Sequence, residues 1–187
     1  MNIELRIKGL ILNHLASLLK NVLTDEYILY KLALVNMFKI FKEYHMSTVA
    51  IVYWSGTGNT EAMAELVAEG VESAGATAEI IQCSAFTTNQ VDSYDAIAFG
   101  CPAMGDEELE DMEFLPMYDD VEPLLGNKPI ALFGSYDWNN GEWMDYWKER
   151  ADEAGLNVVT TTIAKDYPLD EEADACIHLG EQLAQSF

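Results

Sequence analysis

One stretch of the chain restricts its fold more than any other: an apolar, β-branched run that passes through a polar loop into a helical pattern. Residues 48–53 read TVAIVY and residues 54–60 read WSGTGNT, and apolar residues then recur at helical spacing from Glu61 to Ala74. A strand, a short loop and a helix in this order make one β–α unit. The sequence therefore predicts a fold built from such units.

The same alternation recurs through the rest of the chain. Further strands are predicted at Thr77–Gln82, Ala96–Gly100, Pro129–Gly134 and Asn157–Ala164. Helices are predicted at about residues 113–125, 141–154 and 171–184. Several of the strands are apolar on both faces, which is typical of a parallel sheet covered by helices on both sides. We therefore predict a doubly wound α/β fold with five strands.

The loops at one edge of this sheet are the natural place for a ligand. In such folds ligands bind outside the carboxyl ends of the strands, near the point where the strand order reverses. Three predicted loops lie there and are rich in polar and aromatic residues: 54–60, 101–110 and 135–143. We expect the binding site to be built from these three loops.

The first loop opens a helix and is suited to phosphate. Two residues let the backbone fold around an anion and four side chains can donate hydrogen bonds to it: Gly56 and Gly58, and Ser55, Thr57, Asn59 and Thr60. The loop lacks the lysine of a nucleoside triphosphate site and the third glycine of a dinucleotide motif. A capped turn is the alternative, but a cap needs only one such polar residue. Phosphate binding is the favoured interpretation.

The charge changes abruptly near Met46, which indicates a boundary. The chain has ten Lys and Arg and 32 Asp and Glu; residues 1–45 hold six and four of these, so residues 46–187 carry a net charge of −24. The first segment has a helical apolar pattern, but its apolar run is too short and polar to span a membrane, and no convincing signal-peptide cleavage site follows. We expect residues 1–45 to be an N-terminal extension, either an interfacial helix or, as we favour, a stretch translated upstream of a true start at Met46.

Cysteine usage and net charge restrict the setting and the partners. Three scattered cysteines, Cys83, Cys101 and Cys176, predict neither a disulfide framework nor a metal site, and they suit a reducing cytoplasm. The acidic excess argues against nucleic acid and anionic membranes as partners. It favours proteins with basic docking faces.

Three segments together resemble the three flavin mononucleotide (FMN) loops of the short-chain flavodoxins: YWSGTGNTEAMA, GCPAMGDEELE and LFGSYDWNNGEWMDYW. The resemblance covers residues 46–187 and none of residues 1–45. It implies a flavodoxin-like FMN-binding domain with the strand order 2-1-3-4-5. It also implies a monomeric, non-enzymatic, low-potential carrier of single electrons that shuttles between semiquinone and hydroquinone on non-covalently bound FMN. Partners would be reductases, dehydrogenases or other oxidoreductases.

The resemblance also implies a set of cofactor-binding residues in the three loops: Ser55, Gly56, Thr57, Gly58, Asn59, Thr60, Pro102, Ala103, Met104, Gly105, Asp106, Glu108, Ser135, Tyr136, Asp137 and Trp138. The first loop would hold the 5′-phosphate. In the second, Met104 would contact the ring, the Gly105–Asp106 peptide would adjoin flavin N5, and Glu108 would accept the N3 proton. In the third, Ser135 would reach the ribityl chain and Trp138 would stack on the outer face of the ring.

Several of these residues have plainer interpretations, and one departs from the family pattern. Asp137 stands where short-chain flavodoxins usually have glycine. Met104 by itself could fill the core. The other acidic residues of the second loop, Glu107, Glu110 and Asp111, are interpreted as a solvated run. Trp143 and Trp147, four residues apart, are predicted to pack along one helix face and not to contact the cofactor.

Two other functions fit the same fold less well. An FMN-dependent reductase of the quinone or NAD(P)H type would need room for a second substrate over the flavin, and Trp138 would block one face. A receiver-type signalling domain needs an acidic cluster after the first strand and an aspartate after the third, where this chain has Trp54-Ser55 and Cys101-Pro102. We therefore expect an electron carrier, with the FMN reductase as the alternative.

Overall fold

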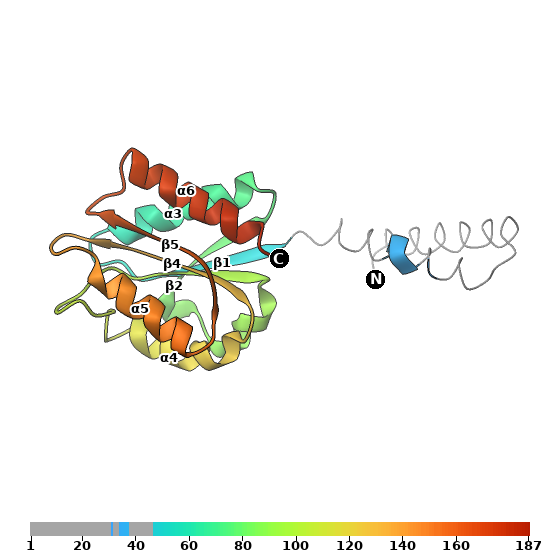
Figure 1. Ribbon diagram of the computed structural model, residues 1–187, viewed down its shortest axis with the longest axis horizontal. Coiled ribbons are helices and arrows are strands. Elements are labelled where there is room, and N and C mark those ends of the chain that lie inside the picture. Colours follow the sequence, from blue (N-terminus) through green and yellow to red (C-terminus); the bar gives the residue numbers. More distant parts are fainter. Residues whose placement is uncertain (1–30, 32–33, 38–46) are drawn as a thin grey trace, which may run out of the picture. The chain divides into compact units, whose positions relative to one another are not determined.

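The computed structural model describes residues 31, 34–37 and 47–187 (Figure 1). The chain divides between Met46 and Ser47 into two units. Residues 31 and 34–37 are helical, whereas most of the helical segment predicted in residues 1–45 lies outside the described residues.

Five parallel strands of the second unit form one sheet in the order β2-β1-β3-β4-β5. The strands are β1 (Thr48–Tyr53), β2 (Thr77–Gln82), β3 (Ala96–Gly100), β4 (Pro129–Tyr136) and β5 (Asn157–Lys165). Each agrees with its predicted range to within two residues, and β4 and β5 extend slightly further toward their carboxyl ends. The predicted doubly wound fold and its strand order are confirmed.

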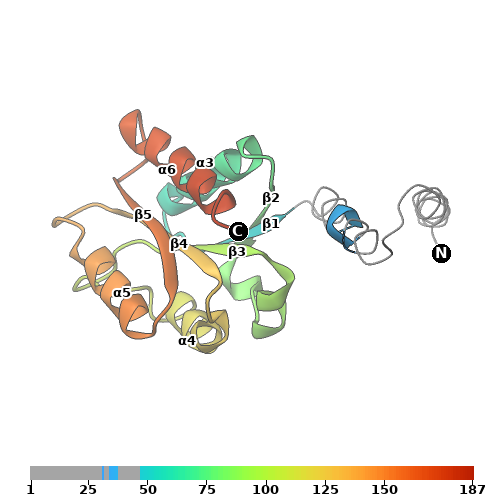
Figure 2. The same ribbon diagram turned by 45° about the vertical axis from the view of Figure 1, so that its right-hand side comes forward.

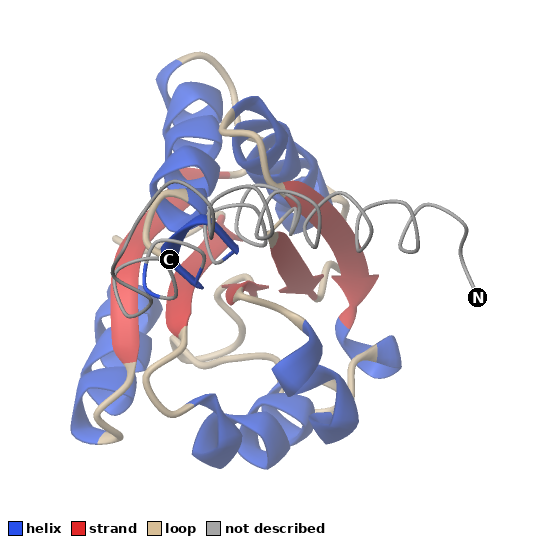
Figure 3. Cartoon of the chain, turned by 90° about the vertical axis from the view of Figure 1, so that its right-hand side faces the viewer, coloured by secondary structure: helices blue, strands red, loops and turns tan. Residues whose placement is uncertain are grey.

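Helices cover both faces of this sheet. They are α3 (Asn59–Ser73), α4 (Phe114–Leu125), α5 (Glu142–Glu153) and α6 (Glu171–Ala184). Figures 1 and 2 show α3 and α6 on one face and α4 and α5 on the other, and Figure 3 shows the strands enclosed between these two layers. Between β2 and β3 the chain forms two short 3₁₀ helices, Cys83–Ala85 and Thr88–Ser93, where the sequence predicts no element.

Each face of the sheet has its own apolar core, as expected for a parallel sheet buried on both sides. On the α4 and α5 face, Phe99 meets Tyr118 edge to face at 5.2 Å between ring centres, and Tyr118 meets Trp147 at 5.5 Å. Trp143 is also buried there, so the predicted packing of both tryptophans is confirmed. On the other face, residues of β1 pack against α3 and α6.

The helices α3 and α6 cross at two glycines. A Cβ atom added to Gly70 would lie 1.9 Å from the carbonyl oxygen of Ile177, and one added to Gly180 would lie 2.1 Å from that of Val67. Both distances are far below van der Waals contact, so the backbones can approach this closely only where neither helix has a side chain. The crossing therefore lies in the carboxyl-terminal half of α3, and the first loop joins this helix at its other end, at Asn59.

Candidate functional site

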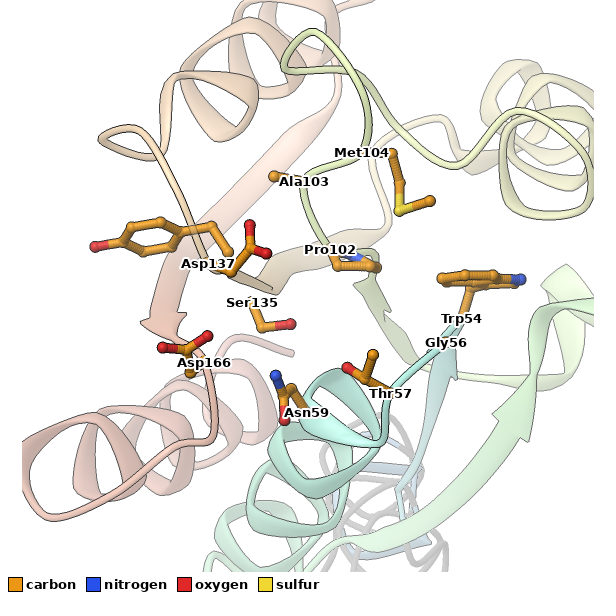
Figure 4. A pocket seen from close by; sticks show the side chains of 11 residues that line it. Trp54, Gly56, Thr57, Asn59, Pro102, Ala103, Met104, Ser135, Asp137 and Asp166 are labelled. Atoms are coloured by element: carbon orange, nitrogen blue, oxygen red, sulfur yellow. The ribbon is translucent and has the colours of Figure 1, made fainter.

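A cavity of about 380 Å³ opens where β1, β3, β4 and β5 end (Figure 4). This edge includes the neighbouring strands β1 and β3, between which the strand order reverses. The cavity is lined by Trp54, Gly56, Thr57, Asn59, Pro102, Ala103, Met104, Ser135, Tyr136, Asp137 and Asp166. These lining residues include no lysine, arginine or histidine, so an anion bound here must be held by uncharged donors.

Loop 1, residues 54–60, leaves the first turn of α3 without a side-chain cap. Gly58 is the N-cap residue, with φ at +93°, and no side chain bonds to the helix end. Ser55 Oγ instead accepts a hydrogen bond from the Gly58 N–H at 3.0 Å, and its own proton remains able to donate. The first amides of a helix have no intrahelical partner, and the helix dipole adds positive potential there. The capped-turn alternative is therefore wrong, and the helix end can accept an anion.

Two buried hydroxyl groups connect loop 1 to β4. Thr60 Oγ1 and Ser135 Oγ lie 2.9 Å apart and share a hydrogen bond, and both residues are almost completely buried. Ser135 lines the cavity, whereas Thr60 does not. Thr60 therefore orients Ser135 and does not itself form part of the cavity wall.

The indole ring of Trp54 forms one wall of the cavity. Its Nε1–H donates to Glu113 Oε2 at 3.1 Å. A Cβ atom at Gly56 would lie 2.8 Å from the ring, so only glycine allows loop 1 to pass this close to it. Figure 4 shows Met104 on the same side of the cavity as Trp54.

Loop 2, residues 101–110, contains a closed five-residue turn. Met104 and Glu108 exchange two backbone hydrogen bonds, each 2.9 Å long. Between them, Gly105 has φ at +47° and Glu107 has φ at +64°, a region that costs a residue with a Cβ atom about 1 kcal/mol. Met104 is 37% exposed and lines the cavity, so it does not fill the core.

Two carboxylates of loop 2 are buried, which contradicts the interpretation of a solvated acidic run. Glu107 is 8% exposed and Glu110 is 5% exposed. Glu110 accepts three backbone N–H bonds from residues 112–114 at 2.8 to 3.0 Å and so caps the start of α4. Glu107 Oε2 accepts the backbone N–H of Trp143 at 2.8 Å, at the start of α5. Its Oε1 is buried and has no hydrogen-bond partner.

Loop 3, residues 137–141, joins β4 to α5, and its residues 137–140 are exposed. Asp137 lines the cavity, but Trp138 is 52% exposed and is not among the lining residues. The start of α5 is tied to the end of β3, because the indole Nε1–H of Trp143 donates to the Cys101 carbonyl at 3.2 Å.

The structure brings nine of the predicted residues to the cavity wall: Gly56, Thr57, Asn59, Pro102, Ala103, Met104, Ser135, Tyr136 and Asp137. The others belong to the same loops without lining it: Ser55, Gly58, Thr60, Gly105, Asp106, Glu108 and Trp138. Two lining residues, Trp54 and Asp166, are absent from the predicted set. Asp166 directly follows β5, so the rule that ligands bind at the carboxyl ends of strands could have identified it.

The cysteine at this edge is not an activated nucleophile. Cys101 directly follows β3 and is completely buried, which raises the pKa of its thiol. Burial, followed by the nearby carboxylates Glu113 and Glu110, also raises the pKa of Cys83 to about 11. Protonated thiols are poor nucleophiles. Neither thiol is therefore activated for covalent chemistry at this edge.

The fold and the cavity together define a doubly wound α/β protein whose cavity and uncapped helix N-terminus suit a ligand such as a mononucleotide. The sequence model of the family described as Flavodoxin matches residues 51–180. The flavodoxin of Megasphaera elsdenii is 47% identical over 138 residues, which are 74% of this chain and 99% of that protein. The flavodoxin of Clostridium beijerinckii is 42% identical and covers 72% of this chain and 97% of its own length.

A solved structure agrees with these relatives. The solution structure of two-electron reduced Megasphaera elsdenii flavodoxin has a TM-score of 0.69 and covers 74% of this chain and 99% of its own. The chain belongs to the flavodoxin family. Its cofactor is FMN, and it is an electron-transfer flavoprotein and not an enzyme. The predicted short-chain flavodoxin assignment is confirmed.

Proposed function

We propose that this flavodoxin holds FMN at the cavity with the phosphate at the N-terminus of α3, and so carries single electrons between redox proteins. The observation that carries the proposal is the uncapped first turn of α3 beside a cavity with no cationic lining residue. A phosphate needs several donors, and the amides and hydroxyls of loop 1 supply them. FMN supplies the one-electron chemistry when bound, and the chain binds and orients it.

The three loops would divide the cofactor between them. Thr57, Asn59 and the loop 1 amides would hold the phosphate, and Ser135, oriented by Thr60, would bind the ribityl chain. Met104 and the Gly105–Asp106 peptide would contact the ring from loop 2. Trp138 would stack on its outer face; since this side chain is exposed, stacking would remove apolar surface from water.

Glu107 is a better candidate than Glu108 for the acceptor of the flavin N3 proton. Glu108 is exposed, and its only hydrogen bonds are made by its backbone. Glu107 has a buried Oε1 that lacks a partner, and its Oε2 is held by the start of α5. An unpaired buried acceptor costs about 1–3 kcal/mol, so a ligand that donates a proton to it is favoured. We therefore assign the role to Glu107.

The partners would be oxidoreductases with basic docking faces, because residues 46–187 carry a net charge of −24. None of the helices in the described part of the chain is long and apolar enough to cross a membrane. The three cysteines are free thiols, which fits a monomeric carrier in the cytoplasm. Electron transfer to a basic partner should slow as salt rises, because charge steering is screened over about 10 Å at 0.1 M. A rate independent of salt would contradict an acidic docking face.

Binding of two flavins tests the site. The apoprotein should bind FMN with one-to-one stoichiometry and far more tightly than riboflavin, which lacks the phosphate. Thr57→Ala should lower the affinity for FMN and leave that for riboflavin unchanged. Equal affinities of the wild type for the two flavins would contradict a phosphate site at α3, and steady oxidation of NADH by a quinone would contradict the carrier function.

We further propose that residues 46–187 form the FMN-binding domain without residues 1–45. All three loops and every lining residue of the cavity lie beyond Met46. A chain that begins at Met46 should fold and bind FMN as tightly as the full chain. A large loss of affinity on this truncation would show that residues 1–45 contribute to the site.

A further inference from the structure

Two aspartates stand side by side at the cavity because of the pairing of β4 with β5. Tyr136 and Lys165, the last residues of β4 and β5, are partners in the strand register, and Asp137 and Asp166 directly follow them. The Asp166 N–H donates to the Tyr136 carbonyl at 2.7 Å, which holds the two chain segments together beyond the sheet. Figure 4 shows both carboxylates on the same side of the cavity, opposite Trp54 and Met104.

The two carboxylates have no compensating partner in the described part of the chain. Neither makes a hydrogen bond or an ion pair there, and no lysine, arginine or histidine lines the cavity. Asp166 has φ at +59°, a conformation that aspartate tolerates better than most residues with a Cβ atom. The charges therefore act on whatever occupies the cavity.

The cavity is consequently polarised. Its α3 side offers donors, namely the first amides of the helix and the polar side chains of Thr57 and Asn59. Its β4 and β5 side offers the carboxylates of Asp137 and Asp166, which accept hydrogen bonds and repel anions. A phosphate is thus attracted to one side and repelled from the other.

Resting on the proposed position of FMN, we propose that Asp137 and Asp166 are specificity-determining residues that confine the phosphate to the α3 side. They thereby hold down the affinity for FMN relative to uncharged riboflavin. A phosphate monoester carries a charge of about −1.5 to −2 at pH 7. Since both carboxylates are exposed, water and salt weaken the repulsion. At about 10 mM salt we expect roughly a threefold effect from each charge and roughly tenfold from both.

The test is the ratio of the affinities for FMN and riboflavin, because any hydrogen bond to the ribityl hydroxyls affects both flavins alike. Asp137→Asn/Asp166→Asn should raise this ratio roughly tenfold at about 10 mM salt, and the increase should disappear near 0.5 M salt. The matched control is Asp152→Asn/Glu153→Gln, which removes two exposed charges at the far end of α5. The control should leave the ratio within about twofold of wild type, since its charges are distant and screened.

Two results would overturn the proposal: an unchanged ratio in Asp137→Asn/Asp166→Asn, or an equal increase in the control. Thr57→Ala, measured in the same way, separates this failure from a failure of the proposed site. If Thr57→Ala lowers the ratio while the double aspartate variant leaves it unchanged, the phosphate site stands and only the role of the two aspartates is wrong. If Thr57→Ala also leaves the ratio unchanged and the wild type binds the two flavins equally, the phosphate is not bound at α3.

Discussion

Replacing Glu107 by glutamine should weaken FMN binding, because a carboxylate has two acceptor oxygens and an amide has only one. Oε2 already accepts the Trp143 N–H at 2.8 Å, and the buried Oε1 has no partner. A glutamine side chain has a single acceptor oxygen, so it could serve either the Trp143 amide or the flavin N3–H. The other donor would then face its NH₂ group.

The strength of the lost hydrogen bond sets the size of this effect. A hydrogen bond to a charged group contributes about 1.5–3 kcal/mol net, and each 1.4 kcal/mol is tenfold in affinity. Glu107→Gln should therefore weaken FMN binding roughly 10- to 150-fold. Glu108→Gln removes the same charge from an exposed position, so it should change the affinity by less than about twofold.

Titration of the apoproteins with FMN, followed by flavin fluorescence, measures both affinities. The same titration with FMN methylated at N3, which cannot donate this hydrogen bond, completes a double-mutant cycle. The wild type should lose affinity for the analogue, and Glu107→Gln should lose little more. Urea unfolding of each apoprotein checks that the substitutions leave the fold intact.

Equal losses in the two glutamine variants would refute this reasoning. So would an undiminished affinity of Glu107→Gln for FMN. In either case the buried carboxylate would serve only to hold loop 2 against the start of α5.

Three further predictions concern packing, ionisation and stacking. Gly180→Ala should lower the free energy of unfolding by about 1–3 kcal/mol, because the added Cβ would overlap the Val67 carbonyl. Alanine favours helices over glycine, so an increase in stability to urea would contradict the close crossing. Burial raises the pKa of Tyr118 from 10.0 to about 12, so the stability due to its neutral form is complete below pH 10 and is lost as the pH rises to 12. Urea unfolding should therefore show that wild type loses more stability than Tyr118→Phe over this range, and equal losses would contradict the burial of the hydroxyl. Trp138→Ala should weaken FMN binding by about 1–3 kcal/mol, and an unchanged affinity by fluorescence titration would place Trp138 away from the ring.

Local pattern was sufficient to predict the sheet and the helices and to single out loop 1 at the edge of the cavity. The run TVAIVY is apolar at every position except its first threonine, and this reports burial on both faces of a strand without knowledge of its neighbours. Loop 1 was equally readable, because its glycines, its hydroxyl residues and the helix that it opens are contiguous in the chain. The three loop motifs were specific enough to identify the family.

Only the tertiary structure decided which residues of the loops are buried and which face the cavity. Glu107 and Glu108 are adjacent acidic residues, and they differ because α5, 36 residues further along the chain, supplies an amide to one of them. Asp166 reaches the cavity because β5 pairs with β4. The spacing of apolar residues reflects which faces of a helix or strand are buried, so the sequence alone determined these elements and the first loop. Contacts between distant segments set the burial of loop side chains, and these became known only from the folded chain.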